Sequence, residues 1–264
     1  MPPARKRTRT YDSVKIRKAV QAQFGHVREA VRTLSPEQLE LPTRLGEWTV
    51  RDLAAHLTMA VETVSRNLAR DEPPAPRLSL LDWPFATAAR AGDIADGTRE
   101  LATANPDLDA LYARTEERFL EALTAPDSRV LAARTGAMTL SDYLVTRTVE
   151  LVVHTDDLSA AVPGLDIPYD RQALAACTRL LADALAAKAP GGSTEVRIPP
   201  YAVVQCVEGP KHTRGTPPNV VETDPLTWIR LATGRLTWKD ALDAAKVSAS
   251  GERADLGGLL PLMS

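Results

Sequence analysis

The chain has 264 residues, 44% of them hydrophobic and 25% charged, a composition typical of a soluble globular protein that excludes a disordered or fibrous one. Its length allows a sizeable core and favours two compact units. The 32 Lys and Arg residues nearly balance the 34 Asp and Glu residues, and no apolar run approaches the ~18 residues that span a bilayer. We therefore expect a cytoplasmic protein whose partners include neither nucleic acid nor a membrane.

The first part of the chain has the periodicity of amphipathic helices. Apolar residues recur at spacings of three and four between residues 12 and 34, which predicts a first helix there. A stronger helix start follows, because Thr49 can act as an N-cap and Asp52 can complete a capping box. One apolar stripe then continues to residue 68, and His56 falls inside it.

A proline-rich stretch from residue 71 to residue 84 predicts an ordered loop. It carries Trp83, whose ring could line the mouth of a pocket or simply pack the loop onto the helices. Helical patterns return at residues 85–104 and 106–123, and a fourth major helix is predicted to begin near Ser141.

The pattern changes after residue 165. A short linker precedes an Ala- and Leu-rich helix at residues 170–189. We then expect strands at residues 195–198, 202–207, 220–223 and 246–249 and helices at residues 226–233 and 237–245. The sequence therefore predicts a helical domain over residues 1–165 and a small α+β domain over residues 166–264.

Three residues indicate a metal site. Glu150 and His154 stand four residues apart on one predicted helix, so both side chains project from the same face. His56, on a second helix, can supply a third ligand across the interior of a bundle. Two histidines and one carboxylate are typical ligands of a catalytic zinc ion with an open fourth position. A Glu and a His at this spacing also occur as a surface pair or an internally satisfied polar pair.

Two neighbours on the same helix face favour the metal site. Arg147 and Asp157 share the face of Glu150 and His154, and four such groups would all need partners inside a bundle. A metal would satisfy two of them. Asp157 could orient His154 by accepting a hydrogen bond, and Arg147 could hold an anionic ligand. Arg147 could instead form an ion pair with Glu150, three residues along the helix.

The two cysteines of the chain, Cys177 and Cys206, fit a reducing compartment. They are too few for a Cys-rich zinc site. If the chemistry needs a thiol, we expect a small-molecule thiol to supply it.

The segment WTVRDLAAHL, which contains His56, and the downstream E-x-x-x-H-x-x-D of Glu150, His154 and Asp157 resemble the mycothiol-dependent maleylpyruvate isomerase family. This family lies within the DinB-like helical-bundle superfamily, and the likeness covers most of residues 12–165. The C-terminal runs LTWIRLATGRLTWKDAL and VSASGERADLGGLLPL look like the sterol-carrier-like domain attached to such bundles in actinobacteria. The resemblance implies a DinB-like four-helix bundle joined to an α/β lobe that closes over the site.

The resemblance also implies a divalent metal, usually zinc, held by His56, Glu150 and His154, with mycothiol as the thiol cofactor. It implies a small unsaturated or electrophilic substrate such as maleylpyruvate. A metal-bound thiol is deprotonated and is therefore a nucleophile at neutral pH. In an isomerase the thiolate would add to the cis double bond of an unsaturated diacid, the resulting single bond would rotate, and elimination would give the trans isomer.

The carboxylates of such a substrate need cationic anchors. Arg235 is the first candidate and Arg147 the second. Because Gly234 looks like a helix C-cap, Arg235 could instead lie on a solvated turn. The loop at residues 209–219 is another candidate for anion binding, through Lys211, His212 and Arg214.

A second hypothesis is a non-catalytic, sterol-carrier-like protein that binds a small molecule or lipid in its C-terminal domain. The bundle would then be structural. The sequence leaves the substrate, the metal species and the oligomeric state open. In the short C-terminal domain a large lipid cavity would compete with the core for apolar residues, which favours the enzyme.

Overall fold

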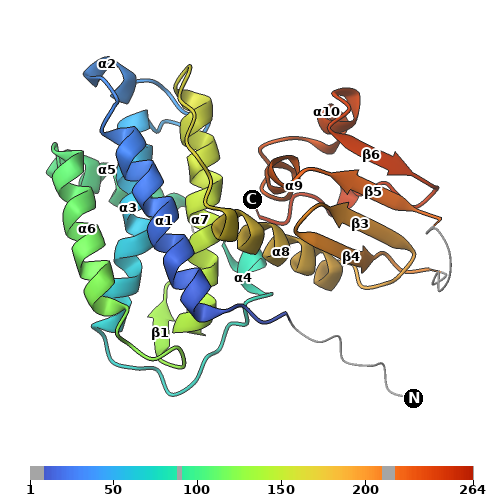
Figure 1. Ribbon diagram of the computed structural model, residues 1–264, viewed down its shortest axis with the longest axis horizontal. Helices are drawn as coiled ribbons and strands as arrows, with labels where there is room; N and C mark the ends of the chain where they lie inside the picture. The colour runs from blue at the N-terminus through green and yellow to red at the C-terminus, as the bar shows by residue number, and fades with distance from the viewer. Residues whose placement is uncertain (1–8, 88–90, 210–217, 264) are drawn as a thin grey trace.

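A computed structural model describes residues 9–87, 91–209 and 218–263, and it shows a helical part beside a smaller α+β part (Figure 1). This architecture confirms the predicted fold class. Within these residues no helix combines the length and the apolar character needed to cross a membrane. Lys211, His212 and Arg214 of the predicted anion-binding loop lie outside the described residues.

Four long helices form the bundle, and α3 contacts the other three. They are α1 (Ser13–Val31), α3 (Val50–Leu68), α6 (Leu108–Ala122) and α7 (Leu140–Ala161). Each begins at a side chain that accepts a hydrogen bond from a backbone N–H of the first turn, and these caps are Asp12, Thr49, Asp107 and Thr139. Thr49 and Asp52 form the predicted capping box.

The two helices that carry the predicted ligands are buried for different reasons. On α3 the predicted apolar stripe faces the bundle, and Leu53 and Leu57 have no exposed surface. Helix α7 packs on α1 and α3 and also on α8 (Arg171–Lys188). It is therefore buried on two flanks, and polar side chains between these flanks must find partners inside the protein.

Shorter elements complete the helical part. They are α2 (Pro36–Leu39), α4 (Trp83–Ala86) and α5 (Ala91–Ala104), and α5 packs on α3. A hairpin of β1 (Val130–Ala133) and β2 (Gly136–Thr139) precedes α7. This hairpin was not predicted, because its strands, VLAA and GAMT, contain few of the β-branched and aromatic residues that favour strands.

The small domain is a four-stranded sheet in the order β4–β3–β5–β6, in which β3 and β5 are parallel and the other pairs antiparallel. Its strands are β3 (Thr194–Ile198), β4 (Ala202–Cys206), β5 (Val220–Thr223) and β6 (Val247–Ser250). Its other elements are α9 (Pro225–Ala232), α10 (Trp238–Asp243) and a 3₁₀ turn at Gly257–Leu259. The predicted strands and helices of this domain are confirmed, with bounds that differ by at most two residues.

Helix α8 joins the two parts. It packs against α1 and α7 of the bundle and against β4 and α9 of the small domain. The buried apolar residues of both parts form one continuous core. Because α8 contacts both sides, the division of the chain between residues 165 and 166 stays a prediction.

Candidate metal centre

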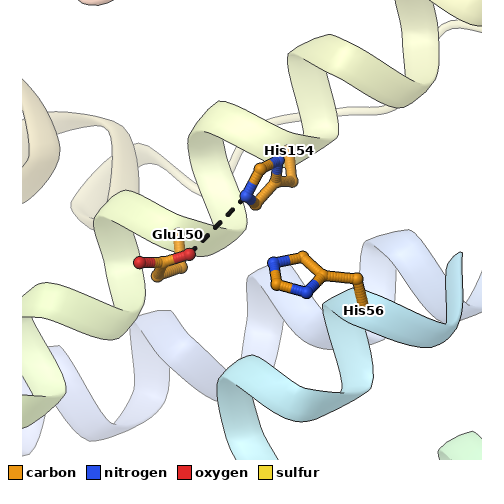
Figure 2. A group of neighbouring side chains, drawn as sticks. All are labelled: His56, Glu150 and His154. Atoms are coloured by element: carbon orange, nitrogen blue, oxygen red, sulfur yellow. Dashed lines mark ion pairs between the residues drawn. The ribbon is translucent and has the colours of Figure 1, made fainter. Parts of the chain in front are cut away.

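His56, Glu150 and His154 point toward one another from two facing helices (Figure 2). His56 comes from α3, and Glu150 and His154 come from successive turns of α7. Each residue offers one ligand atom, and these three atoms lie within 4.8 Å of one another. The fold thus brings together the three residues that the sequence predicts as metal ligands.

The donor set fits a divalent metal ion. Nε2 of His154 lies 3.6 Å from Oε2 of Glu150. The ring centroids of His56 and His154 are 4.8 Å apart, with the rings edge to face. Two ligands that hold zinc at about 2.1 Å with tetrahedral angles lie roughly 3.4 Å apart. Small side-chain rotations would close the set around one ion and leave a further position for water or substrate.

Asp157 orients His154. Its Oδ2 atom lies 2.8 Å from Nδ1 of His154, and the carboxylate has no exposed surface. When Nδ1–H donates to Asp157, Nε2 remains for a metal. Burial lowers the pKa of His154, but the hydrogen bonds to Asp157 and Glu150 outweigh burial and raise this pKa above its ordinary value. Burial raises the pKa of Asp157, but the His154 and Arg235 contacts hold it well below its usual range.

His56 and Glu150 have the protonation states that metal ligands need near neutral pH. Burial and the neighbouring His154 lower the pKa of His56 to about 3, so its ring is neutral. Burial raises the pKa of Glu150, but the contact with His154 outweighs burial, and the pKa falls to about 2. Trp48 packs on the His56 ring at 4.8 Å between centroids, and Oγ1 of Thr98 lies 3.3 Å from its Nδ1 atom. Nε2 of His56 is therefore the nitrogen available to a metal.

Two adjacent aspartates of α7, Asp156 and Asp157, bind three arginines from distant parts of the chain. Arg44, in the loop before α3, donates to both carboxylates at 2.6 Å each. Arg230 of α9 donates to Asp156 at 2.5–3.1 Å. Arg235, just after α9, donates to Asp157 from Nε at 3.2 Å and from Nη2 at 2.9 Å. This aspartate–arginine cluster ties the small domain to the residue that orients His154.

Arg44, Asp156 and Arg230 were not predicted as site residues. The available signal was the Asp156–Asp157 doublet in a predicted core helix, since adjacent buried carboxylates require cationic partners. Arg44 and Arg230 lie 112 and 74 residues from Asp156 in the sequence. No local pattern identifies contacts at such separations.

Arg235 lies in the aspartate–arginine cluster and not on a solvated turn. Its side chain is 18% exposed, and Nη1 donates to the carbonyl of Thr233 at 2.8 Å. Gly234 adopts φ +73° and follows the end of α9, as predicted for a C-cap glycine. Since Arg235 reaches His154 through Asp157, its role as a substrate anchor stays a prediction.

A cavity of about 320 Å³ adjoins the metal cluster between α3, α7 and the β1–β2 hairpin. Its walls include His56 and Glu150 together with the rings of Trp83 and Tyr143. Trp83 is only 1% exposed, so it both packs onto the bundle and lines this cavity. The two alternatives predicted for the proline-rich loop therefore occur together.

Arg147 also lines the cavity and is 8% exposed. Its guanidinium carbon lies 4.5 Å from the ring centroid of Tyr143 and 5.8 Å from that of Trp83. Nε and Nη2 donate to Oγ1 of Thr146 at 3.1 and 3.0 Å, and Nη2 lies 3.9 Å from Oε1 of Glu150. The alternative ion pair with Glu150 is present but long, and the binding of an anionic ligand stays a prediction.

Comparison with protein families agrees with this geometry. A family model described as "Mycothiol maleylpyruvate isomerase N-terminal domain" matches residues 20–159, a little more than half of the chain. The chain belongs to this family. The matched range of the chain contains His56, Glu150, His154 and Asp157. A second model, described as "Bacterial SCP ortholog", matches residues 170–262, so the resemblance is confirmed for both parts.

Two solved structures have a fold similar to that of this chain. They are crystal structures of the mycothiol-dependent maleylpyruvate isomerase and of a mutant of it in which a histidine is replaced by alanine. Each is 17% identical, with a TM-score of 0.57 over 96% of this chain and 97% of the other. Likeness at this identity shows the fold alone. A comparison with curated proteins finds no significant match.

The thiols of this family member are remote from the cavity. Cys177 and Cys206 have no exposed surface and are not among the described residues that line the cavity. Burial raises the pKa of the Cys177 thiol well above its ordinary value. Neither side chain is placed to act as a nucleophile at the metal cluster.

Proposed function

We propose that this chain is an enzyme that uses a divalent metal ion, in the first place zinc, and a low-molecular-weight thiol, mycothiol. Its reaction would be isomerisation of a small unsaturated substrate such as maleylpyruvate, or thiol transfer to a small electrophile. The observation that carries the proposal is the convergence of His56, Glu150 and His154 beside a cavity of about 320 Å³. Membership of the family supports the thiol and the reaction class. Its expected location is the cytoplasm.

The thiol would come from outside the chain. A bound metal would act as a Lewis acid that lowers the pKa of the thiol and so supplies a thiolate nucleophile. Cys177 and Cys206 are both fully buried away from the cavity, so an external thiol is required. The rings of Trp83 and Tyr143 would cover the substrate and limit the access of water to the thiolate.

The residues around the ligands would hold the site in one geometry. Asp157 keeps Nε2 of His154 directed to the metal position, while Arg44 and Arg235 fix Asp157. Arg147 presents a cation at the cavity wall, where a substrate carboxylate can reach it.

The isomerisation balances without a further reactant. When bound, the thiol would supply reversible addition to the cis double bond, which permits rotation to the trans geometry and returns the thiol unchanged. Arg147, which lines the cavity, is the cation that we assign to a substrate carboxylate and to the developing negative charge. Arg235, the first candidate from the sequence, would act on the site by holding Asp157, which orients His154.

The metal content tests the proposal first. Protein purified without added metal or chelator is expected to carry about one zinc ion per chain, because two histidines and one carboxylate converge there. Glu150→Ala is expected to lose this ion, since only two histidines remain. Elemental analysis by mass spectrometry of both proteins measures the difference, and the loaded protein is then assayed with mycothiol and maleylpyruvate.

The absence of metal, even after zinc is offered, would contradict the proposal. The second candidate would then be a sterol-carrier-like binding protein, which the match of residues 170–262 favours. In that case mass spectrometry of an organic extract of the purified protein is expected to reveal an apolar ligand.

A second prediction concerns Arg147. Arg147→Met keeps the contact with Tyr143 but removes the cation, and we expect KM for a carboxylate substrate to rise about 10- to 100-fold, because a charge-assisted hydrogen bond contributes about 1.5–3 kcal/mol. Steady-state kinetics of the zinc-loaded enzyme measures this change. Arg171→Met, which alters an exposed arginine on α8, is the matched control. An unchanged KM in Arg147→Met would remove Arg147 from the site.

A further inference from the structure

Among the described residues, four arginines line the cavity beside the metal cluster, namely Arg66, Arg70, Arg134 and Arg147. Glu150 is the one carboxylate among the lining residues that the structure describes. If Glu150 binds the metal, as the proposed function requires, its charge is committed to that ion. The rest of the cavity wall then carries an excess of positive charge.

Three of the four arginines form an outer rim. Arg66 lies in the last turn of α3, Arg70 follows one turn later, and Arg134 lies in the turn between β1 and β2. All three are exposed, and within the described part of the chain none of their side chains has a hydrogen bond or ion pair. Two other arginines of the helical part do form ion pairs, Arg118 with Glu62 and Arg129 with Glu72.

The helix dipole does not account for this rim. A cation at the C-terminal end of α3 is favourable by itself, which would explain Arg66 and Arg70. Arg134 lies on a hairpin and has no such reason to be there. Its side chain nevertheless lines the same cavity as the other two.

The inner end of the cavity has its own polar groups. Arg147 is 8% exposed and lies against the ring of Tyr143. His56 and Glu150 of the metal cluster line the same end.

The two ends are well separated. Arg66 follows His56 by ten residues on α3, which corresponds to about 15 Å along the helix axis. The wall of the cavity also includes the apolar residues Met59, Ala60 and Ala132, together with Thr63. A ligand that reaches both ends therefore needs an apolar middle several carbon atoms long.

We propose that this cavity selects an elongated substrate with an anionic group at each end. The inner carboxylate would contact Arg147 near the metal cluster, and the outer group, a carboxylate or a phosphate, would bind the rim of Arg66, Arg70 and Arg134. The inner assignment rests on the proposed function. The outer subsite rests on the geometry of the cavity and its three unpaired arginines.

Binding of simple chain-like acids tests the outer subsite without any reaction. Calorimetric titration of zinc-loaded protein, with no thiol present, compares decanedioate and 10-phosphonooxydecanoate with decanoate, and butanedioate with butanoate. Decanedioate or its phosphate analogue is expected to bind at least about fivefold more tightly than decanoate, because the second anion reaches the rim. Butanedioate is too short to span the cavity and is expected to gain nothing from the rim.

Matched variants locate the effect. Arg134→Gln, and more strongly Arg134→Gln combined with Arg66→Gln, should remove the advantage of the long dianions and leave decanoate binding unchanged. Arg171→Gln removes the same charge from an exposed position on α8 and should have no effect. Equal binding of decanedioate, its phosphate analogue and decanoate, or an advantage that survives in the double variant, would overturn the proposal. Because the titration needs neither thiol nor turnover, it tests the outer subsite even if the proposed enzymatic reaction is not observed.

Discussion

Protein with His56→Ala or His154→Ala is expected to lose its metal while the bundle stays folded. Each substitution leaves only two of the three protein ligands for the ion. A ligand contributes roughly 3–4 kcal/mol to zinc binding, so affinity should fall about 100- to 1,000-fold. The fold should survive, because the helices that carry these residues are held by apolar side chains such as Leu53, Leu57 and Leu151, which have no exposed surface. We expect the loss in unfolding free energy to be on the order of 1–3 kcal/mol.

A competition titration with a chromophoric zinc chelator measures the affinity, and circular dichroism measures the fold. His26→Ala is the control, because His26 lies on α1, where its Nδ1 is 3.1 Å from the carbonyl oxygen of Pro168 and remote from the cluster. Full metal occupancy in both His56→Ala and His154→Ala would exclude the proposed site. Loss of helical signal would instead show that the histidines support the bundle itself.

Asp157→Asn is expected to weaken both the fold and the metal site. The Asp157 carboxylate has no exposed surface and accepts hydrogen bonds from His154, Arg44 and Arg235. The amide keeps the shape but removes the charge that compensates two arginines, at a cost of about 3–5 kcal/mol in unfolding free energy. The amide can also present N–H to Nδ1 of His154 in place of an acceptor, and metal affinity should fall about 10- to 100-fold.

Urea denaturation of the metal-free protein separates the first effect from the second, which a zinc titration measures. Asp183→Asn is a matched control, because Asp183 pairs with Arg9 at a partly exposed position on α8. Its cost should stay below about 1 kcal/mol. If Asp157→Asn were as mild as this control, the aspartate–arginine cluster would not connect the small domain to the metal ligand.

Much of the bundle could be predicted from local patterns. The capping box of Thr49 and Asp52 predicted the start of α3, and the spacing of its apolar residues predicted which face is buried. Glu150 and His154 were recognised as a pair because a helix places residues four apart on one face. The polar side chains of Arg147 and Asp157 on the same face then favoured a metal or ligand site over purely apolar packing.

The surroundings of the cluster could not be predicted in the same way. The strands of the β1–β2 hairpin contain few β-branched residues and gave no strand pattern. Its turn residue Arg134 joins the cavity only because the hairpin folds back beside α3. Arg235 was predicted as an anchor for substrate, yet two of its nitrogens donate to Asp157. Its neighbours Arg44 and Arg230 gave no signal, because their partners lie far away in the sequence.

Local sequence patterns predicted the long helices, the strands of the small domain and the three side chains that converge as candidate ligands. These features depend on periodicity and capping, which act over a few residues. The packing of distant segments selects the arginines that meet Asp156 and Asp157 and the side chains that share a cavity with His56. Those contacts depend on how α3, α7 and α9 pack, and packing selects partners by shape and charge across the whole chain.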